Sequence, residues 1–408
     1  MSNPTQDDIS PGMVLLLAAA TGLIVANLYY AQTLVGPISA ATGLSPQAAG
    51  LIVTLTQIGY TLGLLFVVPL GDLLENRRLI VTGLLFTAAM LVLAALSTSA
   101  WMFLTAALGI GLGSVAAQII VPFAAHLSKE ETRGHTVGKV VSGLLLGIML
   151  ARPAASLIAD ASNWHVVFGG AALVVLAVAL VLRAKLPLRA PAAKIAYPAL
   201  MASLWHLFLR TPLLRRRAAY HAGLFGSFSL FWTVTPLMLA GPQFHLSQTG
   251  IAVFALVGMA GAVASPIAGR LADAGHTLMA TAAALALGVA GFALPMLAPQ
   301  VPELRNVALA LLVIASIVLD MGVAANLVLG QRAIFTLGAE VRSRLNGVYF
   351  ALFFAGGALG SALGGWMYAT HGWHAALLTG MAFPGLALLY WLTEYAGHAS
   401  ALKAEVKA

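Results

Sequence analysis

The sequence predicts an all-α polytopic membrane protein, built from two related halves that each cross the bilayer several times. Three observations predict this fold class: the composition, a series of long apolar segments and an internal repeat. Of the 408 residues, 60% are hydrophobic and only 8% are charged, and the mean hydropathy is +0.94. Soluble domains are about half apolar and about a quarter charged. In water this chain would expose large apolar patches, so a bilayer is its natural solvent.

Long apolar segments provide the membrane spans. A hydrocarbon core about 30 Å thick needs about 20 apolar residues in a helix. The sequence contains twelve such segments, at 12–36, 46–70, 79–98, 101–126, 137–159, 164–184, 218–240, 247–270, 277–298, 306–331, 343–369 and 374–394. The first follows Asp7 and Asp8 and continues past Ile24 without a small-residue cleavage site. We therefore expect a first span here and not a cleaved signal peptide.

The basic residues indicate how the chain is oriented in the membrane. Nineteen of the 21 Lys and Arg residues fall on one side of these spans, Arg305 falls on the other side, and Arg152 lies within a span. An excess of Lys and Arg marks cytoplasmic loops. We therefore expect a multi-pass membrane protein with both termini in the cytoplasm. The net charge of +8 is then a topology signal, and we expect no nucleic acid partner.

The two halves repeat. Two segments, EETRGHTVGKVVSGLLLG and AEVRSRLNGVYFALFFAGG, share a Glu, an Arg and a Gly at the same mutual spacing, and a Trp-His pair follows each. One offset of 209 residues aligns these five positions, which are Glu131, Arg133, Gly147, Trp164 and His165 in the first half. The sequence thus predicts a six-helix bundle at 1–184 and another at 218–408.

Residues 185–217 form a basic linker that we expect on the cytoplasmic side. The stretch YPALMASLWHLFLR within it alternates apolar and polar character. It fits an amphipathic helix on the membrane surface, and a simple flexible linker is the alternative.

A repeat of six helices is typical of transporters whose halves rock against each other. Two loops strengthen this interpretation: VPLGDLLENRR after the second span and GRLADAGH after the eighth. Over nearly its whole length the chain resembles the major facilitator superfamily, in which this loop reads Gly-x-Leu-Ala-Asp-Arg-x-Gly-Arg-Arg and helps to latch the cytoplasmic face. The resemblance implies a cytoplasmic gate formed by Asp72, Arg77, Arg78, Gly269 and Asp273. Neither copy matches completely, and a role in turns and topology alone is the alternative.

The fifth span resembles that of bacterial drug or metabolite:proton antiporters of the arabinose-efflux-permease-like kind. Gly143 and Pro153 stand at the spacing of that motif, although Arg152 replaces the glycine before the proline. The resemblance favours export. Gly143 and Gly147 begin a stripe of small residues that suits close helix contact. That contact is either a moving surface against the eighth span in the other half or static packing within one half.

Two charges lie deep in predicted spans. Arg152 lies about 18 Å into the fifth span, where a central arginine costs at least roughly 2.5–3.5 kcal/mol. Asp320 is the one acidic residue deep in any span. The repeat offset gives Arg152 and Asp320 the uncharged counterparts Ser361 and Gly111. We expect Asp320 to bind the coupling proton and Arg152 to tune its proton affinity. A static ion pair between them, or an Arg152 that binds an anionic substrate, remains open.

The resemblance also implies that spans 1, 4, 7 and 10 line a central cavity. The polar and aromatic residues in or near these spans are candidates to contact substrate, although many polar side chains in membranes only bond to a neighbouring helix. They are Asn27, Tyr29, Tyr30, Gln32, Gln57, Tyr60, Gln118, Trp232, Asn326 and Tyr349. An apolar pocket with aromatic walls suits amphipathic or cationic organic molecules.

Together with the resemblance, these observations predict a monomeric secondary transporter of the bacterial inner (cytoplasmic) membrane, not an enzyme, that exports small organic molecules by proton-coupled alternating access in the lipid bilayer. The ten histidines show no metal-ligand spacing, and no phosphate-binding Gly-Lys-Ser/Thr loop is present. We therefore expect no metal and no cofactor, and the proton gradient as energy source. The fourth span lacks the arginine found in many proton-coupled relatives, so a facilitator or importer of a small solute such as a sugar remains open. A non-transporting sensor or scaffold is the alternative from another class.

Overall fold

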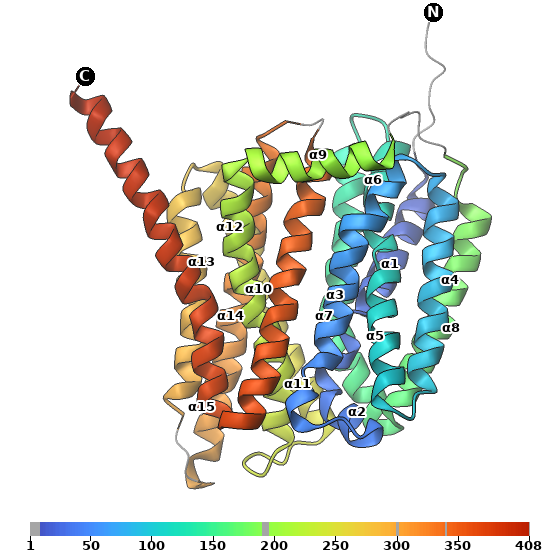
Figure 1. Ribbon diagram of the computed structural model, residues 1–408, viewed down its shortest axis with the longest axis vertical. Coiled ribbons are helices and arrows are strands. Elements are labelled where there is room, and N and C mark those ends of the chain that lie inside the picture. The colour runs from blue at the N-terminus through green and yellow to red at the C-terminus, as the bar shows by residue number, and fades with distance from the viewer. Residues whose placement is uncertain (1–8, 190–195, 299–301, 339–340, 408) are drawn as a thin grey trace, which may run out of the picture. The chain divides into compact units, whose positions relative to one another are not determined.

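The computed structural model describes residues 9–189, 196–298, 302–338 and 341–407, and every regular element in these ranges is helical (Figure 1). The all-α class is therefore confirmed. The chain divides into two compact units. Unit 1 comprises Met1–Ser45, Leu51–His206 and Ser247–Ala252, and unit 2 comprises Pro46–Gly50, Leu207–Leu246 and Val253–Ala408.

Unit 1 contains the helices of the first half. They are α1 (Pro11–Ala26), η1 (Tyr30–Thr33), α2 (Val35–Thr42), α3 (Leu51–Leu62), the π-helix η3 (Gly63–Val67), η4 (Val68–Asp72), α4 (Asn76–Ala95), α5 (Ala100–Ser114), α6 (Ala116–Leu127), α7 (Arg133–Ala161) and α8 (Trp164–Lys185). The helix α9 (Tyr197–Arg210) lies in the predicted linker and buries Leu200 and Leu204 while exposing Trp205.

Unit 2 contains the helices of the second half and the short 3-10 helix η2 (Pro46–Ala48). The others are α10 (Pro212–Ala240), α11 (Gln248–Gly258), η5 (Met259–Val263), α12 (Ala264–Asp273), α13 (Thr277–Met296), η6 (Pro302–Leu304), α14 (Arg305–Phe335) and α15 (Arg342–Lys407). The first residues of α11 belong to unit 1. The helix α10 begins at Pro212, earlier than the expected 218, because Pro at the first helical turn and the basic run after it continue the same helix.

In the described residues, eleven helical segments are long and apolar enough to cross a membrane. The last, Arg342–Gly397, has 56 residues and would reach about 84 Å as a straight helix, far more than a hydrocarbon core about 30 Å thick. The chain bends within it at Gly372, whose φ of 80° and ψ of −171° are not helical. Figure 1 shows α15 as two arms that meet at this bend. The expected segments 343–369 and 374–394 lie in these two arms.

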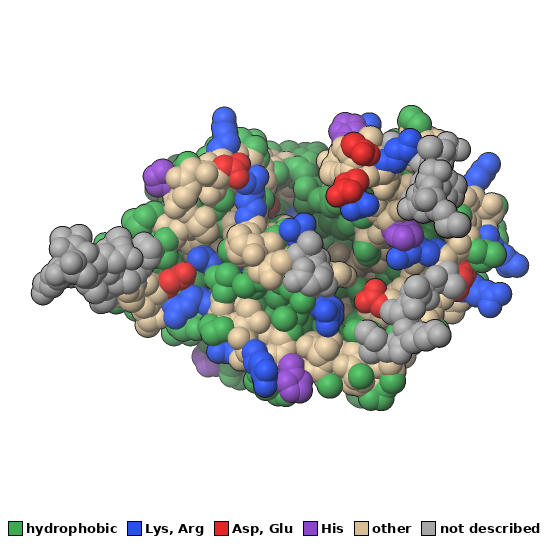
Figure 2. All heavy atoms as spheres, turned by 90° about the horizontal axis from the view of Figure 1, so that it is seen from above, with side chains coloured by type: hydrophobic (Ala, Val, Ile, Leu, Met, Phe, Trp, Pro, Cys, Tyr) green, Lys and Arg blue, Asp and Glu red, His purple; other side chains and the backbone are tan. Residues whose placement is uncertain are grey.

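The surface of the helices is apolar, as a bilayer requires. Large side chains such as Leu15, Trp101, Leu173 and Leu386 are 67% to 82% exposed. In contact with water such residues would be a strong aggregation hazard, whereas lipid tails solvate them without cost. Charged side chains gather elsewhere: Figure 2 shows many Lys and Arg and fewer Asp and Glu on the face seen from above.

Several spans are interrupted helices. The first breaks after Ala26, where the amide of Asn27 donates to the carbonyl oxygens of Leu23 and Ile24 at 3.3 and 2.9 Å. The eighth changes to the 3-10 helix η5 at Met259. Irregular backbone at membrane depth is tolerated only where protein or a wet cavity covers it. Interrupted helices near the midplane are also where transporters bind substrates and ions.

The glycines of α7 pack against α1 within unit 1. A Cβ at Gly143 would lie 2.2 Å from the Ala18 carbonyl oxygen, and one at Gly147 would lie 2.1 Å from that of Gly22. Of the two interpretations left open by the sequence, these two glycines therefore support static packing within one half. A moving contact of this span with the eighth span stays a prediction.

The second half repeats this packing. A Cβ at Gly356 on α15 would lie 2.3 Å from the Ala222 carbonyl oxygen on α10, and one at Gly360 would lie 1.9 Å from that of Gly226. The small-residue stripe in each unit thus joins its first span to its fifth.

The variant Gly147→Ala is expected to lower the thermal stability of the purified protein, because the added methyl group forces α1 and α7 apart. Overpacking of this kind costs typically about 1–3 kcal/mol. Gly138→Ala, on the same helix with open space around its Cβ, is the matched control and should match or exceed the parent. Equal melting temperatures for the two variants would contradict the close contact.

Candidate substrate and coupling site

Arg152 is held inside unit 1 by the interrupted end of the first span. Its Nε donates to Oε1 of Gln32 at 2.7 Å, and its guanidinium lies 5.3 Å from the centre of the Tyr29 ring. The hydroxyl of Thr33 donates to the Arg152 carbonyl oxygen at 3.4 Å. Arg152 is 3% exposed, so the charge cannot reach either membrane surface. Its partners supply hydrogen bonding and a π-face in place of water.

Asp320 is held in the same way inside unit 2. The indole Nε1 of Trp232 on α10 donates to Oδ1 of Asp320 on α14 at 3.3 Å. Gly261 lies directly against this carboxylate residue, since a Cβ there would be 2.6 Å from the Asp320 Cβ. Asp320 is only half-buried, whereas Trp232 is fully buried. The carboxylate therefore combines a fixed donor with partial access.

The two charges share a pattern. Each lies in the middle of a long helix and bonds to a side chain from the first span of its own unit, Gln32 or Trp232. Next to Arg152 the first span is interrupted, and next to Asp320 the eighth span is. An isolated charge at this depth is expensive unless paired or hydrogen-bonded. Unit 1 thus holds a buried cation and unit 2 a half-buried carboxylate, and each is hydrogen-bonded to a side chain of its own unit.

The other predicted cavity residues of unit 1 make contacts of different kinds. The Gln118 amide on α6 donates to the Tyr60 hydroxyl on α3 at 3.1 Å, which joins two helices. Asn27 caps the break in the first span through its amide. Gln57 is buried, and Tyr30 is half-exposed and lines a groove along α1 and α7. Of the unit 1 residues, Tyr30 is placed best to contact a ligand.

Asn326 and Tyr349 meet at a buried histidine that the sequence analysis did not single out. The Asn326 amide lies 3.0 Å from Nδ1 of His221, and the Tyr349 ring stacks on the imidazole at 5.2 Å. All three are at most 1% exposed. Asn326 and Tyr349 therefore face the interior of unit 2 in this conformation. His221 follows a basic run near the predicted start of its span, and this position concealed its burial.

The first predicted gate loop is tied to the end of α8 by a residue outside the motif. Arg189 donates from its backbone to Glu75 at 3.1 Å and from its guanidinium to Asn76 at 2.8 Å. The Asn76 backbone N–H donates back to the Arg189 carbonyl at 3.0 Å. The Arg77 guanidinium donates to the Leu186 carbonyl at 3.2 Å. The first residues of the linker are thus hydrogen-bonded to this loop.

The surroundings of this loop shift the pKa values of Glu75 and of its partner Arg189. Burial alone would raise the pKa of Glu75, but hydrogen bonds from the backbone N–H groups of Arg189, Arg78 and Arg77 hold that pKa below its ordinary value. Burial lowers the pKa of Arg189, and the nearby charge of Asp72 opposes this shift. Asp72 and Arg78 are themselves exposed. Their gating role stays a prediction.

Glu75→Gln is expected to loosen the start of α4 and the segment after α8, because Glu75 caps α4 and accepts from Arg189. Loss of such a cap costs about 1 kcal/mol. Faster hydrogen exchange at the amides of Arg77, Arg78 and Arg189 would report it. Since the pKa is depressed in the folded state, the stabilisation is complete above the ordinary pKa and is lost as pH falls through the folded value. Exchange rates that change neither with the substitution nor with acidification would contradict this role.

The second predicted gate loop contains an ion pair. The Arg332 guanidinium at the end of α14 bonds to the Asp273 carboxylate at the end of α12. A Cβ at Gly269 would lie 3.3 Å from Nη2 of Arg332, so the glycine leaves room for the arginine. The side chains of Arg332 and Asp273 are 47% and 65% exposed. The structure thus joins Gly269 and Asp273 through an arginine that the loop motif does not contain.

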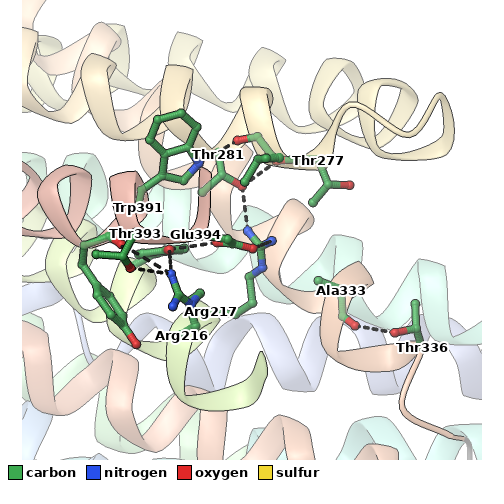
Figure 3. A network of polar contacts seen from close by, with 12 residues as sticks. Arg216, Arg217, Thr277, Thr281, Ala333, Thr336, Trp391, Thr393 and Glu394 are labelled. Carbon is green, nitrogen blue, oxygen red and sulfur yellow. Dashed lines mark hydrogen bonds and ion pairs between the residues drawn. The ribbon is translucent and has the colours of Figure 1, made fainter. Parts of the chain in front are cut away.

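A polar network in unit 2 also escaped the sequence analysis (Figure 3). The Arg217 guanidinium bonds to Glu394 at 2.9 Å and to the Thr281 hydroxyl at 2.9 Å, and the Tyr220 hydroxyl donates to Glu394 at 2.8 Å. Arg216 donates to the Thr393 hydroxyl at 3.0 Å. This network joins α10, α13 and α15. No part of the described chain holds a group of three His, Asp or Glu residues that could bind a metal.

Comparison with known proteins identifies the family of this chain. The family profile of the Major Facilitator Superfamily matches residues 14–334. The chain belongs to the Major Facilitator Superfamily. Among its relatives is the uncharacterized transporter YgaY of Escherichia coli O157:H7, which is 37% identical over 96% of this chain and 97% of that protein. The probable transporter SCO4007 of Streptomyces coelicolor is 31% identical over 88% of this chain and 82% of that protein.

Solved structures of this superfamily share the fold. A bacterial homologue of the human lysosomal transporter Spinster, in its inward-facing and occupied conformation, matches with a TM-score of 0.72. The match covers 96% of this chain and 97% of that one at 15% sequence identity, which supports the fold alone. The family and these relatives place the protein among multi-pass membrane transporters, which are generally not enzymes.

Proposed function

We propose that the protein is a proton-coupled exporter of small organic molecules that works by alternating access in the bacterial inner membrane. In this proposal α15 crosses the membrane twice, which gives twelve spans with both termini in the cytoplasm. The observation that supports it best is the Asp320–Trp232 hydrogen bond, a half-buried carboxylate held by a fixed donor in the middle of a span.

Asp320 can serve as a proton switch for a physical reason. A hydrogen bond from Trp232 favours the charged carboxylate, whereas apolar burial favours the neutral acid. These opposing influences change when helices move, so a small displacement of α10 or of the interrupted eighth span alters how tightly a proton is held. Gly261 permits the close approach that makes this coupling direct.

Arg152 gives unit 1 a charge of opposite sign in a similar setting. A structural scaffold has no need of an arginine at this depth, since an apolar side chain of similar volume is often as stabilising or more so. We therefore assign Arg152 to substrate binding or to control of coupling. The absence of the family's arginine in the fourth span leaves facilitated transport as the rival outcome.

The proposal is tested in energised inside-out vesicles with a panel of cationic drugs, sugars and amphipathic metabolites. A pH-sensitive dye reports substrate-dependent proton release. Asp320→Asn is expected to abolish this release, while Glu130→Gln, which changes an exposed carboxylate, leaves it unchanged. Release that survives in Asp320→Asn would remove Asp320 from coupling. Solute accumulation without any proton movement would show a facilitator in place of an antiporter.

A further inference from the structure

The groove along α1 and α7 offers a binding surface in unit 1. It has a volume of about 710 Å³ and is lined by residues of these helices and by Tyr30. Its walls are apolar and smooth, with Ala19, Gly22, Gly147 and Ala151 among the lining residues. The lining stretch of α7 from Lys139 to Ala154 extends about 22 Å at 1.5 Å per residue. The groove is therefore long and narrow enough for an alkyl chain.

The charge on the lining of the groove is positive. Lys139, which is exposed, is its one charged lining residue, and Ser142 lies beside it. Near the other end, Ala151 precedes the buried Arg152, whose guanidinium lies 5.3 Å from the ring centre of Tyr29, the residue before the groove-lining Tyr30. In the described parts of α1 and α7, Asp160 is the one acidic residue, and it lies near the end of α7 beyond the lining stretch.

This combination selects among amphipathic molecules. An apolar trough takes up the hydrocarbon part of any of them by removing it from water. A cationic head group would meet Lys139 and the potential of Arg152, and none of the residues that line the groove supplies a carboxylate. An anionic head group would pair with the exposed Lys139 at the modest strength of a solvated ion pair.

We propose that the groove binds amphipathic organic anions, with the head group at Lys139 and the hydrocarbon tail lying in the groove along the line where α1 and α7 meet, toward Tyr30. The inference rests on the proposed function, for which it names the substrate class. The occupant is a single-chain solute with a carboxylate, sulfonate or phosphate head. An anionic membrane phospholipid shares this chemistry, and the experiment separates the two.

Binding of a dansyl-labelled undecanoate to the full-length protein in zwitterionic nanodiscs tests the proposal directly, with empty nanodiscs as background. Decanoate is expected to displace the probe, whereas decyltrimethylammonium, of the same chain length, is not. Lys139→Gln should weaken binding about fivefold, the scale of an exposed charge pair. Lys139→Arg should restore it.

Variants that block the groove test whether the hydrocarbon tail binds there. Ala19→Trp fills the groove from α1 and is expected to remove saturable binding, while Leu173→Trp changes another exposed position, on α8, and should bind like the parent. If Ala19→Trp does not fold, Ala154→Trp places the same side chain on the α7 wall. Binding that survives a folded groove-blocking variant would overturn the proposal.

Three results would overturn the proposed class: equal displacement by the cation, binding unaffected by Lys139→Gln, or complete displacement by phosphatidylglycerol built into the nanodisc. The last would make the groove a site for membrane lipid. Because binding is measured without a gradient, these failures differ from failure of the proposed transport, in which the anion binds but drives no proton release.

Discussion

Arg152→Gln is expected to reduce transport about 10- to 100-fold while leaving the protein folded. The substitution removes a charge-assisted hydrogen bond to Gln32 and the cation–π contact with Tyr29, and bonds of this kind are worth about 1.5–3 kcal/mol. Removing a charge from the membrane interior also removes its desolvation cost, so we expect thermal stability to stay level or to rise. Transport and melting temperature are measured on the same purified preparation.

Arg152→Lys separates the geometry of the side chain from its charge. The guanidinium donates sideways through Nε while its plane lies near the Tyr29 ring, and an ammonium cannot do both. Lys is therefore expected to recover only a small part of the lost transport. Arg305→Gln, at an exposed position, is the control. Full transport by Arg152→Gln, or a loss of stability large enough to explain the loss of transport, would assign Arg152 a purely structural role.

Arg152 and Asp320 could be found from the sequence because a charge inside an apolar span is costly and therefore conspicuous. The candidates that hold them, Gln32 and Trp232, could also be found, since both are polar in spans that the resemblance places around a cavity. Which residue bonds to which could not. The assignment depends on where the first span breaks, and that break follows from the amide of Asn27 competing for helical carbonyl groups.

The sequence was a poorer guide where partners lie far apart along the chain. The sequence did not predict that Asn326 and Tyr349 contact His221, because a helical position gives a face only when the neighbouring helices are known. From the sequence alone, Arg217 and Arg189 are basic loop residues that indicate membrane topology. Each in fact bonds to a distant element, Glu394 or Asn76, and no local pattern predicts such pairs.

The spacing of Gly143 and Gly147 predicted the kind of contact but did not decide its partner. Spacing by four residues correctly indicated close helix packing, but the same stripe suits any helix with a small face. The structure places α1 there. Periodicity therefore establishes that a face is smooth, and only the arrangement of helices decides what lies on it.

Arg217→Leu is expected to destabilise the protein by about 3–5 kcal/mol, since it leaves Glu394 without its ionic partner in a mostly buried site. The Arg217 and Glu394 side chains are 6% and 21% exposed, and the same guanidinium also satisfies Thr281. The loss should appear as poor recovery of folded protein and a much lower melting temperature in detergent. Adding Glu394→Gln to Arg217→Leu should restore most of the lost stability, because Glu394 is then no longer an unpaired charge.

Unit 2 supplies its own control for this prediction. Arg332 and Asp273 also form an ion pair, but their side chains are 47% and 65% exposed, and water already solvates both charges. Arg332→Leu should therefore change stability by no more than about 1 kcal/mol. The two pairs differ in burial and in the further bond from Arg217 to Thr281, whereas both join an arginine to a carboxylate. Equal losses from Arg217→Leu and Arg332→Leu would mean that water reaches the Arg217 network, which would then act as a hydrated surface cluster and not as a buried clamp on α10, α13 and α15.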